Sequence, residues 1–302
     1  MTRATRKMLI TGGRGMLATD LVEVAARQGY EVTGLSHEQL DITDADAVQE
    51  ALASLKPDVV VNTPGLAVDA CEESPERGYQ AHTWAPAQMA SACQRLGATM
   101  VYLSTCGLFG DELRAYSEYD DVVLKTHYAR SKYLGEEAVR QACDRALVIR
   151  PGWLFGGSPA HRRNFVYQRY VEAKEKPVLY SAGDKFGSPT STADLAERLI
   201  ELLEAQRYGV YHVVNEGGAS RYDYVKCIVE AFGLSTVVEK VDSSHFPRPS
   251  PVPDSEMLTS LNLRFAGLAA LEPWQEAIHR YAAKLKRLGA AGGPASVLSR
   301  SA

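Results

Sequence analysis

Short apolar runs alternate with stretches of helical periodicity through the first half of the chain. We predict buried strands over residues 7–10, 30–35, 56–62, 99–104 and 146–150. Between them, apolar positions recur three or four residues apart, which predicts helices from residue 17 and over 45–55, 85–96 and 128–143. Repeated strand–helix alternation predicts an α/β fold with a doubly wound parallel sheet.

The pattern becomes more broken after about residue 151. We predict helices over 162–172, 194–204 and 222–232, a strand over 210–214, and a proline-rich stretch over 246–253. Residues 1–150 are expected to form a Rossmann-type NAD(P)-binding domain, to which later segments can return. Residues 151–288 would then mainly form a smaller C-terminal substrate-binding lobe. The Gly-, Ala- and Ser-rich tail over 289–302 is expected to be disordered.

Charge is balanced along the 302 residues, with 33 basic against 37 acidic side chains. No basic stretch is long enough to predict nucleic-acid binding, and no apolar run approaches the length of a membrane span. The basic N-terminus lacks the apolar core of a signal peptide, so we expect a cytoplasmic protein. The cysteines are scattered and form no metal-binding pattern, so we expect free thiols and no metal site. They are Cys71, Cys93, Cys106, Cys143 and Cys227.

A glycine-rich turn follows the first predicted strand and opens the first predicted helix. Its sequence is Thr11-Gly12-Gly13-Arg14-Gly15-Met16-Leu17-Ala18. Gly12 and Gly15 permit a tight turn and the close approach of a pyrophosphate, which a helix N-terminus attracts through its free N–H groups. Ala18 supplies the third small residue needed for close packing. In this context the turn predicts a dinucleotide-binding site.

The choice of dinucleotide depends on the end of the second strand. Proteins specific for NAD usually carry Asp or Glu there to hold the ribose 2′-hydroxyl, whereas this chain has Ser36-His37. Arg14 is available for a phosphate. We therefore predict a preference for NADPH over NADH; the alternative is a solvent-exposed Arg14 and the use of both cofactors.

Tyr128 and Lys132 are spaced one helical turn apart and follow Ser104-Thr105 in the chain. Reduction of a ketone builds negative charge on its oxygen, so the site must offer a proton donor and stabilise that charge. The Tyr128 hydroxyl can donate the proton, and we expect Lys132 to lower its pKa. The Thr105 hydroxyl can supply a second hydrogen bond. A Tyr–Lys pair alone would be an ordinary helix pair, but the glycine turn and Thr105 favour a ketoreductase site.

From residue 8 to about 288, the chain resembles the extended short-chain dehydrogenase/reductases. Within them it is most similar to the dTDP-4-dehydrorhamnose reductases and related nucleotide-sugar 4-ketoreductases. Besides the glycine turn and the Tyr–Lys pair, the resemblance is carried by motifs spread along the sequence. These are Leu40-Asp41-Ile42-Thr43-Asp44, Pro57-Asp58-Val59-Val60-Val61-Asn62, Arg150-Pro151-Gly152-Trp153, Asn164-Phe165-Val166 and Gly183-Asp184-Lys185-Phe186-Gly187-Ser188-Pro189-Thr190.

The resemblance implies Thr105, Tyr128 and Lys132 as the catalytic trio. The dinucleotide site implied by the resemblance and the glycine turn comprises Gly12, Arg14, Gly15, Met16, Leu17, Ser36, Asp41, Ile42, Asn62, Thr63, Pro64, Tyr128 and Lys132. The substrate-binding candidates are Cys106, Gly107, Trp153, Asn164 and Arg248. Other roles stay open for three of these residues: Asn62 can cap a strand end, Trp153 can belong to the core, and Arg248 can be a solvated loop charge.

The chain also departs from the family pattern. Cys106-Gly107 stands where the rhamnose reductases usually carry Asp-Tyr, and the loss of an aromatic side chain there is expected to reshape the substrate pocket. Neither residue can replace the acid pair of the sugar 4,6-dehydratases, which argues against dehydration. His82 stands where Asn is usual, and Lys185 replaces Gln.

Together these observations predict NADPH-dependent reduction of the 4-keto group of a nucleotide-linked 4-keto-6-deoxyhexose in deoxysugar biosynthesis. We expect dTDP as the nucleotide, NADH as a second possible cofactor and a homodimer as one possible assembly. The alternatives are a nucleotide-sugar epimerase and a non-catalytic NADP-binding regulatory subunit. The intact trio of Thr105, Tyr128 and Lys132 argues against the regulatory subunit.

Overall fold

The computed structural model describes residues 5–291, and a six-stranded parallel sheet lies at its centre. Along the sheet the strands follow the order β10-β5-β4-β3-β1-β2. Their bounds are β1 (Lys7–Thr11), β2 (Glu31–Leu35), β3 (Val59–Asn62), β4 (Thr99–Leu103), β5 (Ala146–Pro151) and β10 (Gly209–Val213). All neighbouring pairs are parallel, which confirms the predicted doubly wound fold.

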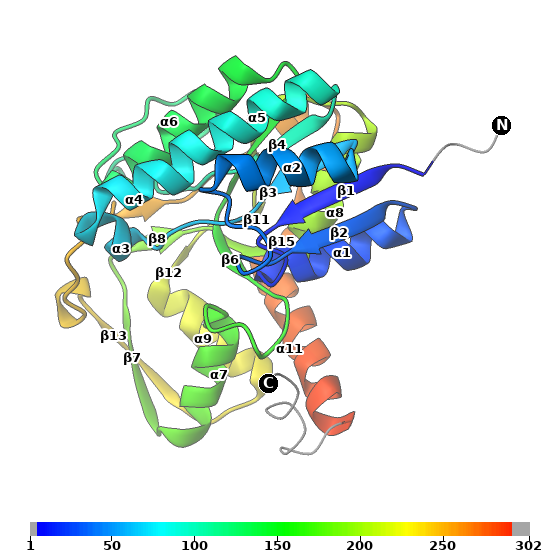
Figure 1. The fold of residues 1–302 in the computed structure, drawn as a ribbon. Coiled ribbons are helices and arrows are strands. Elements are labelled where there is room, and N and C mark those ends of the chain that lie inside the picture. Colours follow the sequence, from blue (N-terminus) through cyan, green and yellow to red (C-terminus); the bar gives the residue numbers. More distant parts are fainter. Residues whose placement is uncertain (1–4, 292–302) are drawn as a thin grey trace.

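Helices cover both faces of this sheet (Figure 1). On one face lie α1 (Met16–Arg27) and α8 (Thr192–Glu204); on the other lie α2 (Ala45–Leu55), α5 (Ala85–Leu96) and α6 (His127–Ala142). Because side chains alternate along a strand, Met8 and Ile10 pack against α1 and α8 while Leu9 packs on the opposite side. Strands covered on both faces read as continuous apolar runs, which is why the sequence identified them.

The strand order reverses between β1 and β3, so this is the topological switch point of the sheet. Ligands of open α/β sheets bind in the crevice outside the carboxyl ends of the strands at such a point. Here the glycine turn leaves β1 and Thr63 follows β3. The fold thus places the predicted dinucleotide residues beside one another.

The second lobe is built mainly from α7 (Phe165–Glu175), α9 (Arg221–Phe232) and α11 (Trp274–Ala291). Its core surrounds the fully buried Tyr224, whose ring contacts those of Trp153, Phe165 and Trp274. Small sheets complete the lobe and its junction with the main sheet. They pair β7 (Val178–Ala182) with β13 (Val237–Val241), β6 (Trp153–Phe155) with β9 (Pro189–Ser191), and β11 (Asn215–Glu216) with β15 (Leu271–Pro273), and they set β8 (Phe186–Gly187) between β12 (Ala219–Ser220) and β14 (Ser255–Glu256).

Short helices before α5 shape the edge of the site. They are α3 (Val68–Glu73), α4 (Pro75–Tyr79) and η1 (Gln80–Trp84), and η1 is a π-helical turn that runs directly into α5. Two further short elements lie in the C-terminal part: η2 (Ser243–His245) and α10 (Leu261–Phe265). Sequence periodicity did not reveal any of these elements.

Several predicted boundaries shift for identifiable reasons. α7 begins at Phe165 rather than at 162, because the Asn164 side chain caps it by accepting a hydrogen bond from the Tyr167 N–H. α8 and β10 return to the main sheet, so the later part of the chain contributes to both units. Of the predicted disordered tail, residues 289–291 continue α11 and the rest lie outside the described residues.

Two expectations about the whole chain can also be compared with the structure. All five cysteines are buried free thiols, as predicted. Within residues 5–291, no helix is both long and apolar enough to cross a bilayer.

Candidate active site

The glycine turn forms an open anion-binding end on α1. Gly12 has φ of +70°, and a Cβ atom there would lie 2.7 Å from the Thr63 hydroxyl oxygen, so the position requires glycine. The Gly15 N–H donates to the Gly12 carbonyl at 2.8 Å, and no side chain caps the helix that begins at Met16. The first N–H groups of α1 are therefore available to a phosphate, and the turn fits a dinucleotide.

Asn62, the last residue of β3, and Thr63, which follows it, hold the switch point together. The Asn62 amide oxygen accepts a hydrogen bond from the Thr11 hydroxyl at 2.9 Å, and the Thr63 hydroxyl donates to the Thr11 carbonyl at 2.7 Å. Asn62 thus ties β3 to β1, while its buried amide nitrogen has no hydrogen-bond partner within the described residues. That donor is therefore available to a ligand or water. Pro64 packs beside Gly12.

The end of β2 carries the residues predicted to select the cofactor. Ser36 is buried, and its N–H is held by the Gln39 side chain at 2.9 Å. Arg14 extends from the glycine turn and lies 3.5 Å from Glu38, with both side chains mostly exposed. Sequence reasoning weighed positions 36 and 37 and overlooked Glu38. The structure therefore sets an acid beside the arginine that was expected to bind a phosphate.

Asp41 and Ile42 occupy the next loop. The Asp41 carboxylate accepts hydrogen bonds from the Thr43 N–H and hydroxyl at 2.9 and 2.8 Å. Ile42 is buried against the core beneath α2. These contacts fix the loop after β2, and a contact of either residue with the dinucleotide stays a prediction.

The Tyr–Lys pair lies on α6 as the spacing predicted. Thr126 caps this helix by accepting a hydrogen bond from the Ala129 N–H at 3.0 Å. Lys132 is buried, and its ammonium donates to the carbonyl oxygen of Leu103, the last residue of β4, at 2.8 Å. Because Thr105 lies two residues beyond Leu103, the contact joins the Tyr–Lys helix to the Thr105 strand end.

Burial dominates the electrostatics of the pair. Burial raises the pKa of Tyr128 above its ordinary value, against an opposing hydrogen bond with Thr105. The net shift is opposite to the lowering expected from Lys132, whose charge is not among its causes, and the effect of Lys132 on Tyr128 stays a prediction. Burial also lowers the pKa of Lys132 to about 8, although Cys71 and Glu136 act in the opposite direction.

A cavity of about 460 Å³ joins the glycine turn to the Tyr–Lys pair. Four of the implied cofactor residues in the turn (Arg14, Gly15, Met16 and Leu17) and Thr63 line it together with Tyr128 and Lys132. The far wall comes from the loop after β6, through residues 160–163. One continuous space can therefore hold a dinucleotide with its reactive end at Tyr128.

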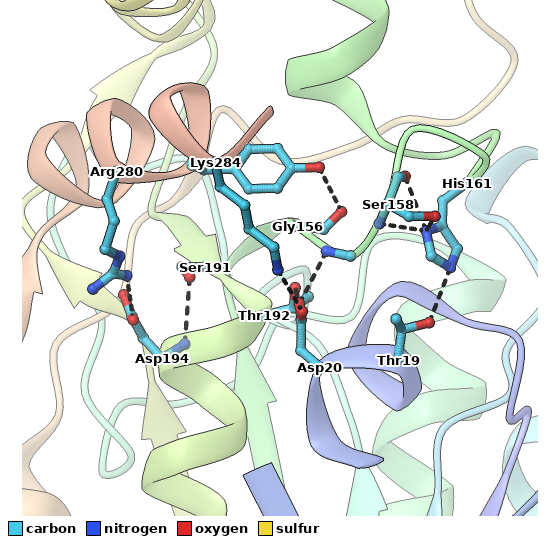
Figure 2. Close-up of polar contacts among 12 residues, drawn as sticks. Thr19, Asp20, Gly156, Ser158, His161, Ser191, Thr192, Asp194, Arg280 and Lys284 are labelled. Carbon is cyan, nitrogen blue, oxygen red and sulfur yellow. Dashed lines mark hydrogen bonds and ion pairs between the residues drawn. The ribbon is translucent and has the colours of Figure 1, made fainter. Parts of the chain in front are cut away.

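Sequence reasoning missed this loop, which adds Arg162 and Arg163 to the cavity wall. Figure 2 shows how it is held against α1. The buried Asp20 carboxylate accepts hydrogen bonds from the Gly157 N–H at 2.9 Å and from the Thr192 hydroxyl. His161 lies 3.3 Å from the Thr19 hydroxyl. The two arginines therefore line the same cavity as the open end of α1.

His82 contacts the catalytic helix from η1. It is fully buried, and its ring packs edge-on against the Tyr128 ring at 5.4 Å between centroids. Its Nε2 accepts a hydrogen bond from the Leu66 N–H at 2.8 Å, so Nδ1 carries the proton and donates to the Ser131 hydroxyl at 2.9 Å. Burial and the charge of Lys132 lower the pKa of His82 to about 2, which keeps the ring neutral.

The substrate-binding candidates divide into two groups. Cys106, Gly107 and Trp153 lie together around Thr105: the Gly107 N–H donates to the Thr105 hydroxyl oxygen at 3.1 Å. Burial raises the pKa of the Cys106 thiol, which keeps it protonated. Trp153 is nine-tenths buried, and its indole N–H donates to Glu256 at 2.6 Å.

Asn164 and Arg248 form their hydrogen bonds and ion pairs with other residues than Cys106, Gly107 and Trp153. The Asn164 side chain is fully buried, where its amide donates to the Gly156 carbonyl at 3.1 Å and to the Tyr281 hydroxyl at 2.6 Å. It shapes the loop before α7, and a direct contact with substrate stays a prediction. The exposed Arg248 pairs with Asp69 at 3.0 Å, and its predicted substrate contact is likewise untested.

Comparison with known proteins shows where these features recur. The family model described as RmlD substrate binding domain matches residues 6–287. The chain is 34% identical to a dTDP-4-dehydrorhamnose reductase of Mycobacterium tuberculosis strain H37Rv over 286 residues, covering 92% of this chain and 93% of the relative. It is 33% identical to the spore coat polysaccharide biosynthesis protein SpsK of Bacillus subtilis, covering 91% and 96%.

Solved structures agree. The dTDP-4-dehydrorhamnose reductase of Bacillus anthracis, determined in complex with NADP, superposes with a TM-score of 0.88 at 27% identity, covering 93% of this chain and 99% of that one. The UDP-glucose 4-epimerase of Thermus thermophilus, in complex with NAD, reaches a TM-score of 0.80 at 22% identity and covers 93% and 99%. The second likeness concerns the fold alone.

Proposed function

The chain belongs to the RmlD substrate-binding-domain family, and from that membership we propose that it reduces the 4-keto group of a nucleotide-linked 4-keto-6-deoxyhexose with NADPH. We propose dTDP as the nucleotide, because several reductases among its relatives are named for dTDP-linked sugars. The observation that carries the proposal is the shared cavity: Tyr128 and Lys132 line the same space as the open N-terminus of α1.

The glycine turn fits the dinucleotide, since any Cβ atom at Gly12 or Gly13 would meet neighbouring atoms at 2.7 Å and no side chain caps the N–H groups of α1 by a hydrogen bond. Arg14, Arg162 and Arg163 would hold its phosphates. When bound, NADPH supplies the hydride for the reduction. The protein must then orient the ketone and supply a proton.

Tyr128 would donate its hydroxyl proton to the ketone oxygen as negative charge develops there. The raised pKa of Tyr128 keeps this hydroxyl protonated at neutral pH, ready to act as the acid. Thr105 would donate a second hydrogen bond to the same oxygen, which stabilises the developing charge. The Lys132 ammonium, anchored on the Leu103 carbonyl, would favour the phenolate that remains after Tyr128 has given up its proton.

Loss of NADPH absorbance with a panel of dTDP-, GDP- and UDP-linked 4-keto-6-deoxy sugars tests the proposal. We expect oxidation with a dTDP-linked sugar, and a loss of turnover by about 10²–10⁴-fold in Tyr128→Phe with NADPH affinity retained. If NADPH binds tightly but is not oxidised in the presence of any of these sugars, the result would count against a reductase. Isomerisation of a nucleotide sugar without net NADPH consumption would indicate an epimerase instead.

We also propose a cytoplasmic location and a homodimer. The five buried free thiols support a reducing compartment. Light scattering of the purified protein would test the assembly, and a monomer at micromolar concentration would contradict the dimer.

A further inference from the structure

A carboxylate that sequence reasoning did not single out lies at the sugar end of the site. Glu256 belongs to β14, which pairs with β8 so that Glu256 stands opposite Gly187. A side chain at Gly187 would collide with the Trp153 ring, so this glycine brings Trp153 against the small sheet. The Trp153 indole N–H can then donate to Glu256 Oε2 at 2.6 Å. The small sheet thereby presents Glu256 towards the catalytic strand end.

Gly107 shows how close Glu256 comes to the reacting centre. A Cβ atom on Gly107 would lie 3.1 Å from Glu256 Oε1 and 3.5 Å from the Thr105 hydroxyl oxygen. The carboxylate and the catalytic hydroxyl therefore flank the same point of the backbone, and a side chain at position 107 would crowd the carboxylate. Glu256 also lies near enough to Tyr128 to raise the pKa of that hydroxyl, as a lesser contribution after burial.

The bonding of Glu256 leaves one oxygen for a ligand. Oε2 is bound by Trp153, whereas no hydrogen bond to Oε1 occurs among residues 5–291. An ionised carboxylate only accepts hydrogen bonds and has room for several donors. The guanidinium of Arg221 lies 3.4 Å above the centre of the Trp153 ring, and its attraction to Glu256 compensates the negative charge within this partly buried corner.

We propose that Glu256 and Gly107 form a hydroxyl-binding subsite, in which Glu256 Oε1 accepts a hydrogen bond from the substrate hydroxyl on the ring carbon next to the ketone. The proposal rests on the proposed function, because Thr105 is taken to bind the ketone oxygen. Because Glu256 Oε1 lies close to Thr105, the substrate hydroxyl that reaches it is the one on the ring carbon next to the ketone. A sugar lacking that hydroxyl leaves the carboxylate without its donor, so the subsite selects hydroxylated over deoxygenated substrates.

The test compares two dTDP-linked 4-keto-6-deoxyhexoses that differ only in the 3-hydroxyl. The wild type should favour the hydroxylated sugar by at least about ten-fold in kcat/KM, as expected for a hydrogen bond to a charged group. In Glu256→Gln this preference should fall to about three-fold or less. The glutamine oxygen can still accept the hydrogen bond from Trp153. If the role of Glu256 were purely structural, the substitution would lower kcat/KM equally for both sugars. Glu239→Gln, an exposed substitution on β13, is the matched control.

Three results would overturn the subsite: equal kcat/KM for the two sugars with the wild type, equal loss for both in Glu256→Gln, or the same change in Glu239→Gln. Calorimetric binding of dTDP-6-deoxyhexoses with and without the 3-hydroxyl supplies a readout that needs no turnover. A ten-fold difference in Kd that disappears in Glu256→Gln would support the subsite even if the ketoreductase proposal failed. Equal affinities would overturn it.

Discussion

Loss of the Glu136 carboxylate should destabilise the protein severely, because it would leave a buried cation without its partner. Glu136 lies one turn after Lys132 on α6, and its side chain is 1% exposed. Both of its oxygens accept hydrogen bonds from Arg150 on β5, with distances of 2.9 Å to Nε and 2.6 Å to a terminal nitrogen. The Ser104 hydroxyl also donates to it.

The magnitude follows from this geometry. In Glu136→Ala the guanidinium of Arg150, 6% exposed, would lose its carboxylate and keep the uncharged neighbours His212, at 3.4 Å, and the Phe109 ring. Breaking a buried pair in this way costs about 3–5 kcal/mol. At about 2.1 cal/mol/K per residue, the unfolding entropy of this chain is about 0.6 kcal/mol/K, so Tm should fall by about 5–8 °C.

Urea unfolding followed by far-UV circular dichroism would measure the loss. Glu137→Ala is the matched control, because Glu137 is the next residue on α6 and its pair with Arg140 is 39% and 48% exposed. That substitution should cost less than about 1 kcal/mol. A double variant, Glu136→Leu with Arg150→Met, should recover most of the stability, since no charge stays buried. A free energy of unfolding of Glu136→Ala within about 1 kcal/mol of the wild-type value would refute the reasoning.

Three further predictions concern the site. Arg14→Ala should weaken NADPH binding by about ten-fold and leave the affinity for NADH unchanged, whereas Glu38→Gln should increase the affinity for NADPH by about two- to five-fold. Fluorescence titration measures both affinities, and equal changes in the affinity for NADH would contradict these predictions. Gly135→Ala should lower stability and kcat despite the better helix propensity of alanine, because its Cβ would collide with the His82 carbonyl; wild-type Tm and kcat would contradict this. Because the pKa of Lys132 is about 8, kcat/KM should fall as the pH rises through that value and the ammonium loses its proton; a profile that stays flat to about pH 10 would exclude the shift.

The local part of the site could be predicted from the sequence. The glycine turn and the Tyr–Lys spacing each lie within one element or one connection, so the residue order fixes their geometry. The central strands were equally accessible, since a strand buried on both faces requires a continuous apolar run. In the structure, α1 begins directly after the glycine turn and Tyr128 and Lys132 both lie on α6, as these motifs predicted.

The long-range part could not be predicted in the same way. Glu256 reaches the site through a two-residue strand, and Arg162 through a loop held by Asp20 more than 130 positions earlier. No periodicity marks such short segments. The net shift of the Tyr128 pKa could not be predicted because desolvation depends on everything that covers the hydroxyl, which spacing does not encode.

The tethering of the loop after β6 has a consequence for the order in which the protein folds. The Asp20 carboxylate on α1 is bound by Thr192 on α8 and lies 3.5 Å from Lys284 on α11. A buried carboxylate is costly until it is paired, so this corner should close only once α8 and α11 have docked against α1. The cavity wall that carries Arg162 and Arg163 would then be among the last parts of the cofactor site to form.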